Sequence, residues 1–199
     1  MMNSCGVILS GGKSSRMGEN KSLLPLNDKP VIEHIANELT LISDKVIVVT
    51  NEPSVYTFLD LPLVADRYFD KGPLAGLETA LYHHQADVYF VTACDMPFIN
   101  RRVYSYLQEH LNDYDAVIPI YENQLQPLAG IYRRSVLPVI QRHLDNDNRK
   151  VLSIVDDIRV NYIHEFGTIP AYVRTKHFFN MNNPAQYEQA KLSWKRNLC

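Results

Sequence analysis

The sequence feature that most constrains the fold is an apolar run that breaks into a glycine-rich, basic loop. Residues Cys5–Leu9 are mostly apolar and suit a buried strand, and Ser10-Gly11-Gly12 follows directly. The cations Lys13, Arg16 and Lys21 come next, within nine positions. Glycine lets backbone N–H groups approach an anion closely, and cations neutralise its charge. The pattern predicts a loop that binds phosphates, around which the rest of the chain is organised.

The loop matches neither of two common phosphate-binding motifs. If the P-loop pattern G-x-x-x-x-G-K-[ST] ended at Gly12-Lys13-Ser14, its first glycine would fall at Val7, inside the apolar run. The dinucleotide fingerprint G-x-G-x-x-G requires a glycine spacing that the loop also lacks. These mismatches argue against a P-loop GTPase and against a dinucleotide site.

We therefore expect a different nucleoside triphosphate clamp, rather than a flexible, solvated turn. Gly11 and Gly12 would bring backbone donors to the phosphates. Arg16 and Lys21 would balance charge as pyrophosphate leaves, because arginine binds phosphate in a bidentate manner and lysine acts as a point charge. Lys13 could simply face solvent.

Length and composition indicate a globular protein with no polyanion-binding surface. The chain of 199 residues predicts a single domain spanning 1–199, and its net charge of -2 argues against a nucleic-acid partner. No apolar stretch approaches the roughly 20 residues of a membrane span, and none suits a signal peptide. Cys5, Cys94 and Cys199 form no C-x-x-C pair, so neither zinc nor a disulfide framework is indicated, which suits the cytoplasm.

Apolar strand patterns alternate with helical patterns along the whole chain, which predicts an α/β fold. We expect a three-layer, Rossmann-like, mostly parallel sheet with helices on both faces. Beyond the first strand, strands are expected at 45–50, 61–65, 87–92, 115–119, 127–132 and 160–164, with a strand end at 178–181. Helices are expected at 30–42, 54–59, 74–84, 100–111, 135–144, 151–157 and 184–195, with Ser135 as the cap of the fifth.

Polar residues follow three of these strands, at the end where such sheets bind ligands. They are the loop after Leu9, Asp66 after the third strand, and Asp95 after the fourth. Asp95 lies too early to cap the helix near Asn100, so we favour it as a Mg²⁺ ligand, because Mg²⁺ binds one or two carboxylates plus substrate phosphates. Asp66 is weaker evidence, since it could equally pair with a neighbour or cap a turn.

Five segments together resemble one family of nucleotidyltransferases. Residues 9–21, LSGGKSSRMGENK, resemble the signature L-A-G-G-x-S-x-R-M-G-x-D-K, and GPLAGL at 72–77 and CDMPFI at 94–99 resemble later blocks of the same superfamily. With QPLAGIY at 126–132 and FFNMNNP at 178–184, the set most resembles the molybdenum cofactor guanylyltransferases (MobA). The resemblance runs from residue 6 to about 190. It implies the fold of nucleotide-diphospho-sugar transferases.

The resemblance also implies a reaction and its residues. GMP would pass from GTP to the phosphate of molybdenum-molybdopterin, releasing pyrophosphate, with Mg²⁺ as cofactor and with possible cofactor-delivery and acceptor proteins. Arg16, Lys21 and Asp95 would be catalytic, and Asp95 would also bind the metal. Asn180 and Asn182 match an N-x-N on the pterin side. The nucleotide-binding set would be Leu9, Ser10, Gly11, Gly12, Lys21, Asp66 and Asp95.

Three positions depart from the family pattern. Ser10 replaces the usual alanine, Asn20 replaces the common aspartate before the lysine and receives no role, and Asn183 replaces the usual threonine. Alternatives also stay open: CTP in place of GTP, transfer of a nucleotide to a sugar phosphate, or a nucleotide-binding module without catalysis. Base choice is expected to depend on the loop at 66–76.

Overall fold

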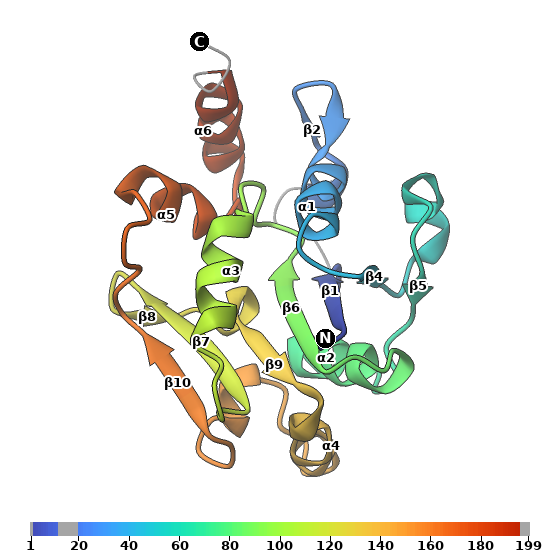
Figure 1. Cartoon of the computed structure of the whole chain (residues 1–199). Helices are drawn as coiled ribbons and strands as arrows, with labels where there is room; N and C mark the ends of the chain where they lie inside the picture. The colour runs from blue at the N-terminus through green and yellow to red at the C-terminus, as the bar shows by residue number, and fades with distance from the viewer. Residues whose placement is uncertain (1, 12–19, 196–199) are drawn as a thin grey trace.

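The computed structural model describes residues 2–11 and 20–195 of the chain. An eight-stranded sheet has the order β10-β7-β9-β6-β1-β4-β5, with β8 beside β7 (Figure 1). β9 runs antiparallel to β6 and β7, and the pairs β1–β4, β1–β6, β4–β5 and β7–β10 are parallel. The strands are β1 (Ser4–Leu9), β4 (Lys45–Val49), β5 (Leu63–Val64), β6 (Val88–Ala93), β7 (Ala116–Tyr121), β8 (Gln124–Leu125), β9 (Ile131–Arg133) and β10 (Val160–Ile163).

Helices cover both faces of this sheet (Figure 1). The α-helices are α1 (Val31–Thr40), α2 (Gly72–His83), α3 (Arg101–Glu109), α4 (Leu137–Asp145), α5 (Ala171–His177) and α6 (Pro184–Lys195). The 3-10 helices are η1 (Lys21–Leu23), η2 (Pro53–Leu59), η3 (Pro127–Ala129), η4 (Arg134–Val136) and η5 (Val151–Ile154), and a hairpin joins β2 (Pro25–Leu26) to β3 (Lys29–Pro30). The hairpin and α6 project side by side at one end, where Tyr187 donates to the Pro25 carbonyl (Figure 1).

The sheet separates two hydrophobic clusters. In β1, Ile8 packs with α1, α3, α5 and α6, whereas Val7 and Leu9 pack with α2, α4 and η5. Successive strand residues point to opposite faces, so a strand with both faces covered must be apolar throughout. All six residues of β1 are buried, which explains the uniformly apolar run that the sequence shows.

Most expected elements are confirmed, and three are wrong in instructive ways. Residues 127–132 form η3 and then β9, because Pro127 begins a 3-10 turn closed by Ala129 N–H and the Gln126 carbonyl. Ser135 does not cap a helix: it lies inside η4, and its hydroxyl donates to Asp115 Oδ1 at 2.8 Å.

The third difference concerns residues 178–181, which contain no strand. Phe178 N–H binds the Arg174 carbonyl and so completes the end of α5. The apolar residues here belong to the core without joining the sheet: Phe178 stacks on Tyr121 of β7, and Phe179 lies against Phe98. With seven residues, α5 is too short to show a helical period in the sequence.

No helix in the described residues is long and apolar enough to cross a membrane.

Gly130, between η3 and β9, lies close to the backbone of β7, so we expect a larger side chain there to destabilise the fold. A Cβ added there would lie 2.8 Å from the Val117 carbonyl oxygen, which is backbone and cannot move aside. We expect Gly130→Ala to lower the free energy of unfolding by about 2 kcal/mol in urea denaturation. Gly11→Ala is the matched control, because the described residues leave open space around its Cβ. Equal stability of the two variants would contradict the prediction.

Candidate functional site

Two adjoining cavities open at the carboxyl ends of β1, β4, β5 and β6. The larger, about 520 Å³, extends toward Gly72 and Gly76 of α2 and is called here the α2 cavity. The smaller, about 410 Å³, extends toward Asn20 and Lys21 and is called the Lys21 cavity. Both are lined by Gly11, Asn51, Asp70, Cys94 and Asp95.

The strand ends beneath the cavities are tied by backbone hydrogen bonds. Ser10 N–H donates to the Val49 carbonyl at 2.9 Å, and Cys94 N–H donates to the Leu9 carbonyl at 3.1 Å. These bonds continue the parallel pairing of β1 with β4 and β6 by one step beyond the strands. Leu9 lines the α2 cavity, Ser10 the Lys21 cavity, and Gly11 both. The predicted loop therefore begins at the centre of the site, whereas Gly12 and Arg16 lie outside the described residues.

Asp66 lies in the α2 cavity, in a reciprocal pair with Asn51. Asn51 Nδ2 donates to Asp66 Oδ2 at 2.9 Å, and Asp66 N–H donates to Asn51 Oδ1 at 3.0 Å. Asp66 Oδ1 is buried and has no hydrogen-bond partner among the described residues. Burial raises the pKa of this carboxyl, and the bond from Asn51 opposes the rise. Close approach of α2 depends on Gly76, where a Cβ would lie 3.0 Å from Leu9 Cδ2.

Asn51 is a cavity residue that the sequence analysis missed. It lines both cavities and holds Asp66. The sequence pattern that pointed to Asp66 also applies to Asn51, because Asn51 follows the apolar strand β4 as Asp66 follows β5. Asp70, which also lines both cavities, has a φ of 55°, a left-handed conformation that aspartate tolerates better than most residues.

Asp95 lies where the two cavities meet. Its carboxyl is partly buried, and this burial raises its pKa while the charge of Lys21 opposes the rise. It does not cap α3, because the Asn100 side chain does so by accepting from Arg102 N–H at 2.9 Å. Capping of α3 therefore does not account for an acid at position 95.

The segment after α5 reaches the same site through its backbone. Met181 N–H donates to the Asp95 carbonyl at 2.8 Å, and Lys21 Nζ donates to Asn182 Oδ1 at 3.4 Å. The structure thus brings Asn182 to Lys21, a contact that the sequence analysis did not predict. It does not bring Asn180 into either cavity: Asn180 Nδ2 donates to the nearby Phe178 carbonyl.

The donor set suits a cation that is shared with a ligand. Among the described residues, no group of three or more His, Cys, Asp or Glu side chains could hold a metal ion. Mg²⁺ binds through one or two carboxylates and completes its shell with phosphate oxygens and water. Asp95 fits that habit. Cys94 does not compete, because burial raises its pKa to about 11 and keeps the thiol protonated.

The rim of the α2 cavity is braced by the loop between α4 and η5. Tyr68 donates to Asp145, Lys71 pairs with Asp147, and Leu74 N–H donates to the Arg149 carbonyl. Between them, Gly72 has a φ of 65°, and a Cβ there would lie 3.2 Å from that carbonyl. Residues 73–76 belong to the loop at 66–76 on which base choice is expected to depend. They lie in the first turn of α2.

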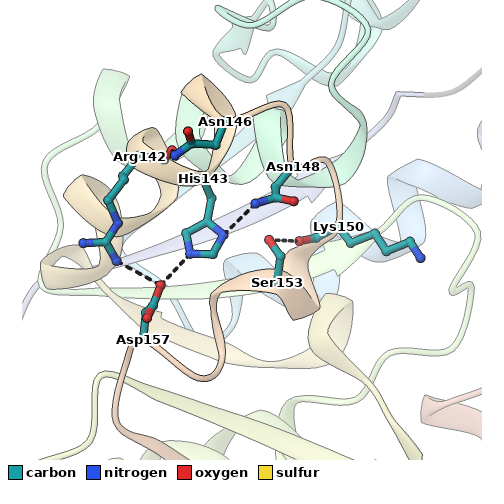
Figure 2. Close-up of polar contacts among 7 residues, drawn as sticks. All are labelled: Arg142, His143, Asn146, Asn148, Lys150, Ser153 and Asp157. Atoms are coloured by element: carbon teal, nitrogen blue, oxygen red, sulfur yellow. Dashed lines mark hydrogen bonds and ion pairs between the residues drawn. The ribbon is translucent and has the colours of Figure 1, made fainter.

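Side-chain contacts of Asp157 and His143 hold this bracing loop on the side away from the cavity rim (Figure 2). Asp157 accepts from Arg142 at 2.9 Å and lies 2.6 Å from His143 Nε2. The opposite ring nitrogen of His143 lies 3.2 Å from Asn148 Nδ2, within the loop itself. The bonds from His143 and Arg142 lower the pKa of Asp157, so the carboxylate stays charged. The cluster is structural support for the rim rather than a second site.

Comparison with known proteins gives consistent results. The family model described as the MobA-like NTP transferase domain matches residues 6–160. A "Probable molybdenum cofactor guanylyltransferase" of Carboxydothermus hydrogenoformans is 40% identical over 95% of both chains. One of Clostridium perfringens is 35% identical over 94% of this chain and 96% of its own. The solved structure of molybdopterin-guanine dinucleotide biosynthesis protein A from Archaeoglobus fulgidus, 24% identical, has the same fold, with a TM-score of 0.82 over 96% of this chain and 99% of that one.

The raised pKa of Asp95 generates a stability prediction. Its folded-state pKa lies above the ordinary value of 3.8, so the folded protein binds this proton more tightly than the unfolded chain does. The penalty of the buried charge is absent below that value, grows as pH rises through the folded-state pKa, and is complete above it. We expect Asp95→Asn to raise the free energy of unfolding at pH 7 by about 1 kcal/mol.

Denaturation at pH 7 and near pH 3 measures this effect, and the gain should vanish at the lower pH. Asp87→Asn is the control, because Asp87 is exposed at the opposite end of β6 and accepts from Asn3 N–H. A gain at both pH values, or an equal gain in the control, would show that burial of the Asp95 charge is not its cause.

Proposed function

The chain belongs to the MobA-like NTP transferase family, and from this premise we propose that it transfers GMP from GTP to the phosphate of molybdenum-molybdopterin. An oxygen of the acceptor phosphate attacks the α-phosphorus of GTP, the bond from that phosphorus to the bridging oxygen breaks, and pyrophosphate leaves. The product is molybdopterin guanine dinucleotide. The observation that carries this proposal is the meeting of the loop start, Lys21 and Asp95 at one sheet edge.

The roles of the chain's own groups follow from their positions. Backbone N–H groups at Gly11 bind phosphate oxygens, and Lys21 offsets negative charge that builds up on the leaving pyrophosphate. The Asp66–Asn51 pair offers fixed acceptors and donors to the base and ribose in the α2 cavity. Such a transfer depends on positioning and charge balance more than on covalent help from the protein. Arg16 and Gly12 are proposed as further phosphate contacts on the basis of the sequence resemblance alone.

Asp95 is proposed as the residue that holds Mg²⁺. The ion would orient the phosphates of the nucleotide and supply positive charge to them. The side chain fits this role because it is partly buried, lies at the junction of the two cavities, and is not used by any helix cap. The nucleotide would contribute the remaining oxygen ligands.

The acceptor is proposed to approach from the segment at 178–182. This segment is joined to the Asp95 carbonyl through Met181, and Asn182 contacts Lys21. Acceptor and nucleotide would then share one cation, Lys21, which would help to hold the two reacting groups close together. Asn180 is proposed as an acceptor residue on the sequence match only.

The relative affinities of the protein for GTP, CTP and ATP test whether GTP is the nucleotide donor. The relatives' names favour GTP over CTP as the donor and the molybdenum cofactor over a sugar phosphate as the acceptor. GTP with Mg²⁺ should therefore bind more tightly to the purified protein than CTP or ATP. Competition against a fluorescent GTP analogue measures this order. Tight binding of CTP with weak binding of GTP would overturn the guanylyl assignment. Binding of GTP without pyrophosphate release, when molybdenum-molybdopterin is supplied, would indicate a module without catalysis.

Two substitutions test the catalytic groups by pyrophosphate release. Lys21→Ala should lower turnover by about 100-fold, because it removes the charge that the leaving group meets. Asp95→Asn should abolish the Mg²⁺-dependent rate while the circular dichroism spectrum is retained. Lys29→Ala is the matched control and should behave as wild type, because Lys29 is exposed and pairs with Glu33 on the surface. Unchanged kinetics in Lys21→Ala would remove that residue from the mechanism.

A further inference from the structure

A buried tyrosine hydroxyl joins the two ends of the phosphate loop. Tyr56 lies in η2, between β4 and β5, and its side chain is 1% exposed. Its hydroxyl oxygen lies 2.7 Å from Ser10 Oγ, before the loop, and 2.7 Å from Asn20 Nδ2, after it. Ser22 Oγ lies 2.9 Å away on the same side as Asn20. Three side chains from both ends of the loop therefore converge on one atom.

The protons of this group can be assigned without conflict. Ser22 donates its hydroxyl proton to Asn20 Oδ1 at 2.7 Å, so Ser22 Oγ is free to accept the proton of Tyr56. The Tyr56 oxygen then accepts from Asn20 Nδ2 and from the Ser10 hydroxyl. Each of the three hydroxyls has an acceptor for its proton, and the ring of Asn20, Tyr56 and Ser22 closes on itself. A fully satisfied buried network of this kind holds its members in one arrangement.

Two of the three departures from the family signature meet in this group. Ser10 stands where alanine is usual, and alanine has no hydroxyl to donate. Asn20 stands where aspartate is common, and a carboxylate cannot donate a hydrogen bond to Tyr56 while it accepts one from Ser22. Neither substitution has an evident purpose when it is considered alone. Together they provide the two donors that the Tyr56 oxygen accepts.

We propose that Tyr56, with Ser10 and Asn20, forms a clasp that positions Gly11 and Lys21, the residues next to Ser10 and Asn20, for the nucleotide. The clasp acts through its neighbours: Ser10 precedes Gly11, whose backbone lines both cavities, and Asn20 precedes Lys21 and caps η1. Tyr56 also lines the Lys21 cavity, but its hydroxyl is engaged by Ser10, Asn20 and Ser22, so its role is that of a positioning residue. The inference rests on the proposed function in one respect, namely that Gly11 and Lys21 bind the phosphates.

The test compares two buried tyrosines that differ in what their hydroxyls hold. Tyr56→Phe leaves Ser10 and Asn20 without their partner. Tyr104→Phe, the matched control, removes a buried hydroxyl that donates to the Val91 carbonyl at 2.7 Å inside the core. We expect both variants to lose stability, because each leaves a buried polar group unpaired. We expect only Tyr56→Phe to weaken GTP binding, by about tenfold, with Mg²⁺ present and Kd measured by calorimetry.

Hydrogen–deuterium exchange supplies a readout that needs no nucleotide. The amides at 22–24 should exchange faster in Tyr56→Phe than in wild type and should be unchanged in Tyr104→Phe, since Asn20 accepts from Ser22 N–H. Exchange alike in the two variants, or GTP affinity within twofold of wild type in Tyr56→Phe, would overturn the clasp. If wild type bound CTP in place of GTP, the proposed donor would be wrong, and the same comparison with CTP would still judge the clasp.

Ser10→Ala provides a second variant should Tyr56→Phe fail to fold. It removes one bond of the group by deleting a single oxygen, and we expect GTP affinity to fall by about threefold. In the double variant with Tyr56→Phe, the loss should be smaller than the product of the two single losses, because both remove the same bond. Losses that multiply would show that the two hydroxyls act independently and would contradict the proposal.

Discussion

The structure depends on the placement of β1 between β4 and β6, parallel to both. A strand in that position has both faces covered and both edges paired, so its direction and register cannot shift without breaking two ladders. The residues that follow it, Ser10 and Gly11, are fixed to the sheet by the hydrogen bond from Ser10 N–H to the Val49 carbonyl. A loop anchored in this way can offer its backbone donors to a ligand from a defined point.

Two carboxyl groups at the same edge of the sheet are charged at a cost in free energy, because they are partly buried. Burial raises the pKa of both Asp66 and Asp95; a hydrogen bond from Asn51 opposes the rise at Asp66, and the charge of Lys21 and a backbone hydrogen bond oppose it at Asp95. A fold selected for stability alone would not keep carboxylates there. Acids with a raised pKa at a cavity mark a candidate ligand site, and in the proposed function a ligand or a cation would offset both charges.

Support for the site comes from polar side chains outside the α2 cavity on one side and at the wall of the Lys21 cavity on the other. On one side, the Asp157–His143–Asn148 chain holds the loop that braces Gly72. On the other, Tyr56 holds both ends of the phosphate loop. Both supports are polar, and the Tyr56 support joins segments far apart in the chain. Their geometry limits how far each cavity wall can move, and this pre-organisation lowers the ordering cost of ligand binding.

The sequence by itself determined the class of the fold and the edge where the site lies. Uniform apolar strands require a sheet covered on both faces, and parallel strands place their carboxyl ends together, so Leu9, Asp66 and Asp95 had to converge. Local spacing also sufficed for α1, β4 and the cap at Asn100. Tertiary structure alone decided the partners: Asn51 for Asp66, Asn182 for Lys21, and Tyr56 for Ser10 and Asn20. It also decided that 178–181 is buried without joining the sheet. The physical reason is that periodicity records which side of an element is buried, whereas a hydrogen bond between distant side chains depends on how separate elements pack, and no local pattern carries that information.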